Sequence, residues 1–423
     1  MRSVISAVII TLVVVAFGLY AGEGDTTGPE PKIKFELIWE GEIPEGVNDV
    51  IFLDEKGYNV FSVQCKDPEG ALRDKRVLMV EGDRLRYYEG EGMELVREVE
   101  LSGGHVVVSK NGRNIVTIEG LERDTMKEGS YIDKPAVLRL YRWDGEELGE
   151  VEISPGGWGY IYLYPLGNDK AIAVSKIGND GTDYQISMFI REGKVLREVF
   201  KADGQYPTGV FDYAEDGSVA FFVYTSWDIP RKNRGRYVER VVIDGEGKEI
   251  VRYGYRHPGW AGWVSPRGRY LVEVTRGKYL VIRERGGKLI AEHHVQGEGN
   301  YFAAFSPDEK YLCVTPGFRK IYFFETQTGK FIWEYTYPDD RPSFFPGDVA
   351  PEGEFTFMVF TPSKEESKWI WVFDKGGKVV GKLGPLDFSG YSLPVRYVDQ
   401  VQQLFVRLPS RMFLYRLVKI GGE

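Results

Sequence analysis

Cysteine and histidine are scarce in this chain of 423 residues, which contains two cysteines and four histidines. Two cysteines are too few for a disulfide-rich scaffold or a zinc cluster. The 54 basic residues are outnumbered by 63 acidic ones, and a net charge of −9 argues against a general nucleic-acid binder. The sequence also lacks the catalytic and nucleotide-binding spacings G-x-S-x-G, G-x-x-x-x-G-K-S/T and H-E-x-x-H. We therefore expect no cofactor, no metal and no nucleic-acid partner.

The N-terminal segment has the pattern of an export signal. Arg2 precedes an uncharged, mostly apolar stretch from Ser3 to Gly22. Because about 18 apolar residues can span a bilayer, a cleaved signal peptide and a retained membrane anchor (residues 1–22) both remain open. Residues 23–32, EGDTTGPEPK, are polar, contain Gly and Pro, and form a predicted linker. The segment predicts an extracytoplasmic protein, either periplasmic, held in the cell envelope or secreted, with membrane contact only through an uncleaved N-terminus.

A Gly-Lys pair recurs five times, followed by two apolar residues in four copies and by Glu249 and Ile250 in the other. It occurs in REGKVL, GEGKEI, RGGKLI, QTGKFI and KGGKVV, whose glycines before the lysine are Gly193, Gly247, Gly287, Gly329 and Gly377. Glycine adopts positive φ in tight turns without steric cost, and each pair separates two runs rich in β-branched and aromatic residues. The pattern predicts a β-hairpin at each of these positions.

Another turn signal precedes each of these hairpins, and we call it the first turn signal because it comes earlier in the repeat. It occurs as SKNGR (109–113), AEDGS (214–218), SPRGR (265–269), SPDEK (306–310) and APEGE (350–354), with LDEKG (53–57) and GNDK (167–170) as weaker members. Each is followed by a short apolar run. One repeat is therefore strand, polar turn, strand, loop, strand, Gly-Lys turn, strand. Four antiparallel strands in about 40–55 residues are the signature of a propeller blade.

Counting these repeats predicts the fold class. Seven repeats lie at roughly 48–101, 103–153, 156–201, 205–253, 258–296, 299–337 and 343–383. The remainder, 391–418, offers three strands, while residues 33–41 (IKFELIWEG) match fourth-strand segments such as KFIWEYTY. Pairing the two termini completes an eighth blade and closes the ring, which avoids unpaired backbone groups at an open edge. We predict an all-β, eight-bladed β-propeller over residues 33–418, with 419–423 as a tail. Seven blades is the alternative, because the third strand of the first repeat looks irregular.

The sixth repeat carries a family resemblance. The segment AFSPDEKYLCVTPGFRKIYFFE resembles the S-P-D-G-K repeat of TolB-type and WD-like propellers, and FFETQTGKFIWEY resembles the pyrroloquinoline-quinone-type repeat. The resemblance implies that Trp39 and Trp333 sit at the docking position of such repeats. Quinoprotein dehydrogenases carry adjacent cysteines beside their cofactor, whereas Cys65 and Cys313 stand alone, so the resemblance does not extend to that chemistry. Eight-bladed periplasmic scaffolds of the outer-membrane assembly type, which hold no cofactor, suit the chain better.

The two cysteines are predicted to be separate, buried free thiols. They fall in the expected second strands of the first and sixth blades, which lie tens of ångströms apart on an eight-bladed ring. A disulfide requires Cα atoms within about 7 Å.

Long insertions are expected between second and third strands, at 66–75, 121–135, 226–236 and 362–368. In a four-stranded meander these loops share a face with the connections between blades, which are rich in Gly and aromatic residues. Loops on one face of a rigid scaffold commonly bind partners. The predicted binding residues are Trp158, Tyr160, Tyr206, Trp260, Trp263 and Tyr301, together with His105, His257 and Asp348 at the starts or within the first strands.

These observations support two functional hypotheses. The first is an exported, non-enzymatic propeller that binds a protein, peptide or glycan on the insertion-bearing face. The second is an extracytoplasmic hydrolase or lyase whose site lies in the axial funnel, with His105, His257 and Asp348 as the available acids and bases.

Overall fold

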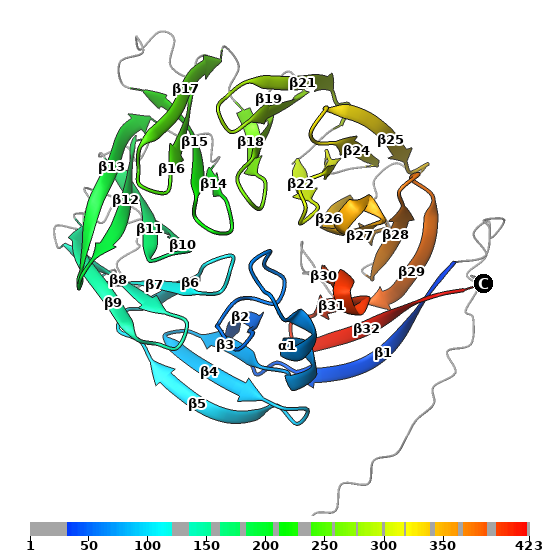
Figure 1. Ribbon diagram of the computed structural model, residues 1–423, viewed down its shortest axis with the longest axis horizontal. Coiled ribbons are helices and arrows are strands. Elements are labelled where there is room, and N and C mark those ends of the chain that lie inside the picture. Colours follow the sequence, from blue (N-terminus) through cyan, green and yellow to red (C-terminus); the bar gives the residue numbers. More distant parts are fainter. Residues whose placement is uncertain are drawn as a thin grey trace, which may run out of the picture.

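The strands form small sheets arranged radially around a central axis (Figure 1). The computed structural model describes residues 32–120, 135–153, 161–177, 183–205, 211–226, 238–255, 259–275, 278–297, 301–316, 319–338, 343–362, 367–386 and 395–420. Within these ranges, the strand pairings group into eight antiparallel sets of four, which we number as blades 1 to 8. The predicted all-β propeller is confirmed.

The first four blades follow the chain in order. Blade 1 contains β2 (Val47–Phe52), β3 (Val77–Glu81), β4 (Arg84–Glu89) and β5 (Glu94–Glu100). Blade 2 contains β6 (His105–Val108), β7 (Asn114–Glu119), β8 (Ala136–Arg142) and β9 (Glu147–Ile153). Blade 3 contains β10 (Ile161–Leu166), β11 (Lys170–Ile177), β12 (Asp183–Glu192) and β13 (Val195–Gln205). Blade 4 contains β14 (Phe211–Tyr213), β15 (Val219–Ser226), β16 (Val238–Asp244) and β17 (Glu249–Tyr255). A few bridges from β13 to β9 and β15 join blades 2, 3 and 4 into one larger sheet.

The remaining blades complete the ring. Blade 5 contains β18 (Gly259–Val264), β19 (Tyr270–Thr275), β20 (Tyr279–Glu284) and β21 (Leu289–His294). Blade 6 contains β22 (Phe302–Phe305), β23 (Tyr311–Thr315), β24 (Lys320–Glu325) and β25 (Lys330–Thr336). Blade 7 contains β26 (Ser343–Val349), β27 (Phe355–Thr361), β28 (Lys368–Asp374) and β29 (Val379–Leu386), with a 3-10 turn, η3 (Pro351–Gly353), after β26. Blade 8 contains β30 (Val395–Val398), η4 (Asp399–Val401), β31 (Gln403–Arg407), β32 (Arg411–Lys419) and β1 (Ile33–Glu42).

The N-terminal strand closes the ring as predicted. β1 pairs antiparallel with β32 from Ile33 opposite Lys419 to Glu42 opposite Arg411, so the outer strand of blade 8 comes from the start of the chain. Figure 1 shows the blue β1 beside the red β32. Ile33 is buried in the same core cluster as Phe357 and Val395, which ties β1 into the packing between blades 7 and 8.

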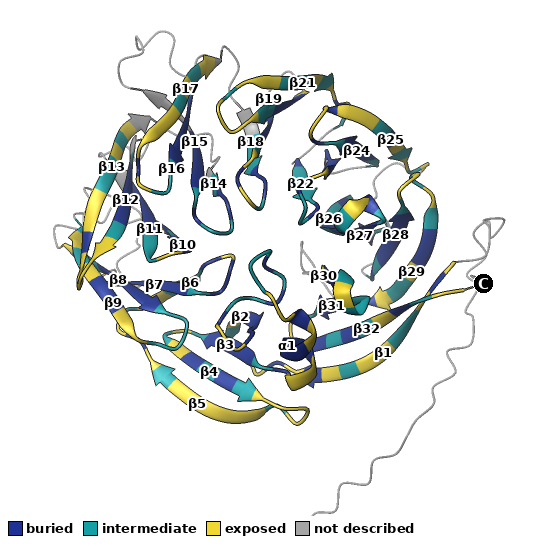
Figure 2. Cartoon of the chain, viewed as in Figure 1, coloured by how far each residue is buried: buried dark blue, intermediate teal, exposed yellow. Residues whose placement is uncertain are grey.

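Burial follows strand position in each blade. The second strands β7, β23 and β27 are buried along most of their length, because neighbouring blades cover both of their faces. The outer strand β5, by contrast, is exposed at almost every position. Figure 2 shows this gradient from buried inner strands to exposed outer ones. The gradient explains why the runs after the first turn signal, such as YLCV and FTFMV, are continuously apolar.

The first turn signal forms one recurring hydrogen-bonded hairpin. In five blades, the first residue of this turn makes two backbone hydrogen bonds. Its carbonyl accepts the N–H of the residue three positions later, and its N–H donates to the carbonyl of the residue five positions later. These first residues are Ser109, Ala214, Ser265, Ser306 and Ala350. Where the first residue is serine, its Oγ also accepts the N–H five residues on, at 3.0 Å each time. This bond gives the S-P-D-G-K-like motif its physical basis.

The Gly-Lys turns pack against the preceding blade. In blade 7, Gly377 has a φ of 80°, and a Cβ placed there would lie 2.6 Å from Cδ2 of Trp333 in blade 6. Trp333 is buried and stacks on Phe323 and Phe373, at centroid distances of 5.0 and 5.7 Å. The implied docking position of Trp333 is therefore seen directly. Trp39 lies at the matching place in blade 8, where its Nε1 donates to the carbonyl of Glu91 in the outer turn of blade 1.

We expect Gly377→Ala to destabilise the fold by roughly 2–4 kcal/mol. The substitution combines the cost of positive φ with a clash against Trp333, and each contributes roughly 1–3 kcal/mol. The matched control is Gly193→Ala, because Gly193 has a φ of 68° but nothing within 4 Å of an added Cβ. Urea unfolding checks the prediction. Equal losses in the two variants would contradict the packing explanation.

Blade 1 departs from the predicted arrangement. Residues 53–76 connect its first strand, β2, to its second, β3, and contain the helix α1 (Pro68–Asp74). The predicted placement of 66–75 between the second and third strands is therefore wrong. The third strand predicted to be irregular is in fact a regular hairpin of β3 and β4. The insertion lies at the opposite end of the ring from loops that follow second strands, because the chain reverses direction at each strand.

The cysteine predictions are confirmed in part. Both cysteines are free thiols. Cys313 is buried in β23, with its Sγ 3.7 Å from Sδ of Met358. Cys65 lies in the connection 53–76 instead of a strand and is only partly buried, so its predicted strand position and full burial are wrong.

Candidate functional site

The insertion 53–76 is fixed to the first turns of neighbouring blades. The backbone N–H of Asn59 donates to the carbonyl of Asn111 in blade 2 at 2.7 Å. Nη1 of Arg113 donates to the hydroxyl of Tyr58 at 2.9 Å, and the guanidinium lies over the ring of that tyrosine. These contacts hold the first half of the insertion against blade 2.

The insertion also reaches blade 4. The N–H of Val63 donates to Oε2 of Glu215 at 2.9 Å, and Glu215 lies in the first turn of blade 4. The ammonium of Lys110, from blade 2, contacts Asp212 and donates to the carbonyl of Tyr213 at 2.7 Å. Contacts between blades 1, 2 and 4 therefore converge at the end of the ring where the first turns lie, and the insertion extends across this end.

Three carboxyl groups in the described part of the chain have pKa values raised by burial. They belong to Asp49, Glu215 and Asp348, whose ordinary values are 3.8, 4.5 and 3.8. A carboxyl group with a higher pKa in the folded state binds more protons when folded. The contribution of all three groups to folding stability therefore increases as pH falls from the raised folded values toward the ordinary ones, and decreases as pH rises through that window.

We expect Glu215→Gln to keep the bond from Val63 and to be at least as stable as the natural chain at pH 7. Its stability should also rise less on acidification from pH 7 to pH 5, because one of the three carboxyl groups with a raised pKa is gone. Urea midpoints at pH 7, 6 and 5 measure both effects. A less stable variant with an unchanged pH slope would show that the carboxylate itself stabilises the fold.

Four residues of the predicted binding set can be placed in full, namely Trp263, Tyr301, His105 and Asp348. Trp263 is partly buried and Tyr301 buried, and both pack in the core cluster that contains Val272 of blade 5 and Leu312 of blade 6. His105 is exposed at the start of β6 in blade 2. Trp158, Tyr160, Tyr206 and His257 lie outside the described residues, as does the side chain of Trp260. The structure thus brings Trp263 and Tyr301 together as packing residues, and partner binding by this set stays a prediction.

Asp348 joins two blades. Its Oδ1 accepts the N–H of Val349 at 2.9 Å, and its Oδ2 accepts the N–H of Tyr397 in blade 8 at 2.8 Å. Asp212 does the same between blades 4 and 5, where its Oδ2 accepts the N–H of Val264 at 2.8 Å. Because both of its oxygens accept backbone hydrogen bonds, Asp348 has an architectural role of its own.

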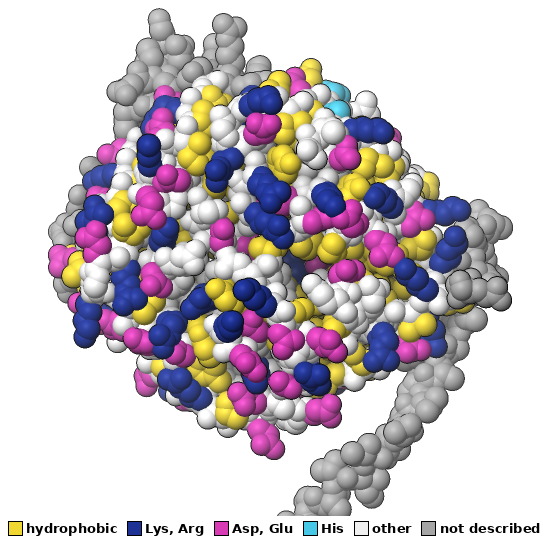
Figure 3. Space-filling view, in the orientation of Figure 1, with side chains coloured by type: hydrophobic (Ala, Val, Ile, Leu, Met, Phe, Trp, Pro, Cys, Tyr) yellow, Lys and Arg dark blue, Asp and Glu magenta, His cyan; other side chains and the backbone are white. Residues whose placement is uncertain are grey.

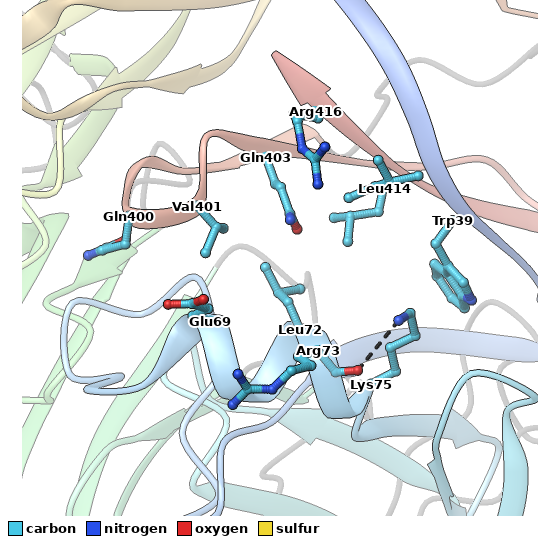
Figure 4. Close-up of a pocket in the computed structure, with 11 residues that line it drawn as sticks. Trp39, Glu69, Leu72, Arg73, Lys75, Gln400, Val401, Gln403, Leu414 and Arg416 are labelled. Atoms are coloured by element: carbon cyan, nitrogen blue, oxygen red, sulfur yellow. Dashed lines mark hydrogen bonds between the residues drawn. The ribbon is translucent and has the colours of Figure 1, made fainter. Parts of the chain in front are cut away.

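A groove of about 370 Å³ lies between α1 and blade 8 (Figure 4). We call it the α1 groove. Its walls come from α1, η4, β31, β32 and β1, and its lining residues are Ile38, Trp39, Glu69, Leu72, Arg73, Lys75, Gln400, Val401, Gln403, Leu414 and Arg416. In Figure 4, Gln403 and Arg416 extend from blade 8 toward α1, and Leu72 extends from α1 toward them. The groove therefore combines an apolar floor with polar and cationic groups, the usual composition of a ligand site.

Comparison with known proteins identifies the fold of the chain and gives no information on its activity. No family model matches the chain, and no curated protein matches it. Among solved structures, BamB from Moraxella catarrhalis is 10% identical with a TM-score of 0.52, covering 90% of this chain and 100% of that one. The C-terminal WD40 domain of Sif2 is 10% identical with a TM-score of 0.54, covering 93% and 100%. Sqt1 from Saccharomyces cerevisiae is 8% identical with a TM-score of 0.50, covering 81% and 93%.

The chain has a β-propeller fold. At these identities the likeness establishes the fold alone, and the function has to be argued from the site.

The α1 groove of this propeller was missed by the sequence reasoning, although one local signal pointed to its helix. Asp67 caps α1 by accepting the N–H of Gly70 at 2.9 Å, and Pro68 occupies the first helical turn. Asp followed by Pro and Glu69 is a recognisable helix start. The signal gives a helix but not a groove, because most of the opposite wall comes from residues more than 300 positions away in the chain.

Proposed function

We propose that this propeller is an exported, non-enzymatic scaffold that binds a protein partner, with the α1 groove as a binding site. The observation that carries the proposal is the insertion 53–76. It interrupts a regular series of blades, it is held by hydrogen bonds to blades 2 and 4, and it forms the groove with blade 8. A pre-organised element on a rigid scaffold loses little conformational entropy on binding, which favours a recognition role.

Export is supported by the pattern of residues 1–22, which lie outside the described residues. β1 begins at Ile33, directly after the linker, so cleavage before that residue leaves the closing strand intact. Among the described residues, no helix has the length and apolar character needed to cross a membrane.

The face predicted from the sequence remains a second candidate surface. The connections after the second strands β7, β15 and β27 include or adjoin the predicted insertions 121–135, 226–236 and 362–368. By the reversal of chain direction at each strand, the ends of β7, β15 and β27 from which these connections leave lie at the opposite end of the ring from α1. A protein, peptide or glycan partner on that face is still a prediction.

Site-directed photo-cross-linking in the source cells tests the proposed function. A photoreactive amino acid is introduced at one of three positions. Gln400 is exposed at the groove, and Asn233 lies in the insertion 226–236. Val195, which is exposed on the outer strand β13, is the matched control. We expect one specific protein to be captured from Gln400 and not from Val195. Capture of a protein from Asn233 alone would indicate that the partner binds at the insertion 226–236 and not at the α1 groove. Absence of a specific protein from every position would contradict the binding function.

A further inference from the structure

We infer that the α1 groove recognises an acidic peptide segment that also carries a large apolar side chain. The inference rests on the proposed binding function and specifies the chemistry of its ligand. Three properties of the groove support it: the charge of its lining, its apolar floor, and a buried hydrogen-bond acceptor.

The lining is cationic on an acidic protein. It contains Arg73, Lys75 and Arg416 but one carboxylate, that of Glu69, whereas the whole chain has a net charge of −9. Across the face in Figure 3, basic and acidic side chains are interspersed, so the excess of cations in the groove is local. A local positive lining favours anionic segments and disfavours cationic ones.

Arg416 is the cation best placed to meet a ligand. It is exposed on β32 and forms no ion pair within the described part of the chain. Glu36 lies opposite it across the β1–β32 ladder, but the carboxylate of Glu36 is 3.9 Å from Nζ of Lys34. Lys75, in contrast, is buried, and its Nζ lies 3.4 Å from Oε1 of Glu91, outside the lining. Arg416 is therefore the natural partner for a ligand carboxylate, in a fork geometry that suits such groups.

The apolar floor of the groove depends on a β-bulge. The β1–β32 register shifts between Leu37 and Trp39, so Ile38 has no partner, and Ile38 and Trp39 both line the groove. A bulge redirects side chains in this way. Leu72 and Leu414, each 2% exposed, complete the floor.

Blade 6 has the same Ile-Trp pair at a β-bulge but, within the described residues, no groove beside it. Its bulge also falls before the tryptophan, leaving Ile332 unpartnered ahead of Trp333. There the turn of the next blade packs directly on Trp333 at Gly377 and buries it. In blade 8 the corresponding tryptophan, Trp39, is only partly buried and borders the groove beside α1. An apolar side chain of a ligand can therefore occupy a space that is filled in blade 6.

The third property is the amide oxygen of Gln403. Its Oε1 is buried and has no hydrogen-bond partner among the described residues. Figure 4 shows the side chain directed into the groove. A buried acceptor without a donor costs free energy, and the N–H of a bound peptide backbone would remove that cost. This feature favours a peptide, whose backbone N–H groups lie next to its side chains, over an anion without an N–H or O–H donor.

The test is a selection from a phage-displayed heptapeptide library on the full chain as the cells produce it. The natural chain is compared with Arg416→Glu and with the matched control Arg267→Glu, an exposed arginine in the first turn of blade 5 outside the groove lining. We expect the natural chain and the control to enrich peptides in which Asp or Glu adjoins Leu, Phe or Trp. Arg416→Glu should lose this enrichment at least ten-fold.

The best selected peptide is then made with a fluorescent label, and its Kd is measured by polarisation. We expect Arg416→Glu and Ile38→Asp each to raise the Kd at least ten-fold. Gln403→Leu should raise it while leaving the thermal midpoint unchanged or higher, which separates a binding role from a structural one.

Three results would overturn the inference. One is the absence of acidic sequences among the selected peptides, and another is selection unaffected by Arg416→Glu. The third is binding of phosphatidylglycerol vesicles, but no peptide, in a manner that depends on Arg416. If Gln400 cross-links a specific protein while acidic peptides are not enriched, the proposed function stands and the ligand chemistry inferred here is wrong.

Discussion

Removal of residues 33–42 is expected to prevent the propeller from folding to a stable monomer. The deletion takes away β1, which forms nine aligned pairs with β32 and buries Ile33 in the core between blades 7 and 8. It also removes Trp39 from its packing against Phe52, at a centroid distance of 6.1 Å. Each buried apolar side chain contributes about 1.5–3 kcal/mol, so the combined loss approaches the roughly 5–15 kcal/mol that separates folded from unfolded domains.

The deletion also leaves β32 as an unpaired, largely apolar edge, which favours self-association. We expect aggregation on size-exclusion chromatography and loss of the cooperative thermal transition. Two controls accompany the deletion of residues 33–42. A chain that lacks residues 1–31 should keep the thermal transition unchanged. A circular permutant, in which a flexible linker joins Ile420 to Ile33 and the new termini lie at Gly193, should keep it unchanged as well. A truncated chain lacking 33–42 that melts like the natural one would show that β1 is dispensable.

Glu273→Ala is expected to destabilise the propeller by roughly 3–5 kcal/mol, the usual cost of removing one partner of a buried ion pair. Oε2 of Glu273, in blade 5, accepts a hydrogen bond from Nε of Arg240, in blade 4. Arg240 is fully buried and Glu273 is 3% exposed. Arg283 adds a second cation, with its Nε 3.7 Å from Oε1 of Glu273. The substitution therefore leaves two guanidinium groups in a buried interface without this carboxylate.

The double variant Arg240→Met with Glu273→Leu is the control for that prediction. Apolar residues of similar volume avoid the desolvation cost of Arg240 and Glu273, so we expect the double variant to recover the part of the lost stability that comes from Arg240, while Arg283 stays without the carboxylate. Chemical denaturation of the natural chain, the single variant and the double variant gives the comparison. A double variant as unstable as Glu273→Ala would mean that packing at this interface, and not the unpaired charge, sets the cost.

The turns of the fold were predictable because each is encoded within a few consecutive residues. Glycines such as Gly377 mark positive φ, and serines such as Ser306 bond to the N–H five residues later, so the sequence pattern and the geometry coincide. Ring closure was predictable for the same reason, since LIW in β1 repeats the FIW that surrounds the bulge of β25.

Blade 1 was misassigned because partner choice is not local. Residues 61–65, FSVQC, have the composition of a strand, but β3 pairs with β2 in their place. Phe61 instead stacks on Phe405 of blade 8 at a centroid distance of 5.4 Å, and Leu72 joins the same core cluster. Tertiary packing against another blade decided the conformation of this segment, and a single sequence does not show which blade that is.

Glu309 illustrates a second limit. It occupies the turn position that is glycine in most other repeats, with a φ of 62°. Its Oε1 accepts hydrogen bonds from Oγ of Ser265 at 2.6 Å and from the N–H of Arg267 at 2.7 Å, both in blade 5. The sequence shows only that a glycine is missing, whereas the compensating bonds come from the preceding repeat. The α1 groove escaped prediction for the same reason, because Leu72 and Arg416 meet only in the closed ring.

Hydrogen exchange of residues 33–42 tests ring closure most directly, and the α1 groove depends on that closure. Mass spectrometry of deuterated peptides from the natural chain compares this segment with the outer strands β5 and β25 and with a free peptide of the same sequence. We predict slow exchange at the β1 amides that bond to β32, comparable to the other outer strands. Exchange as fast as in the free peptide would contradict a ring sealed by its N-terminal strand.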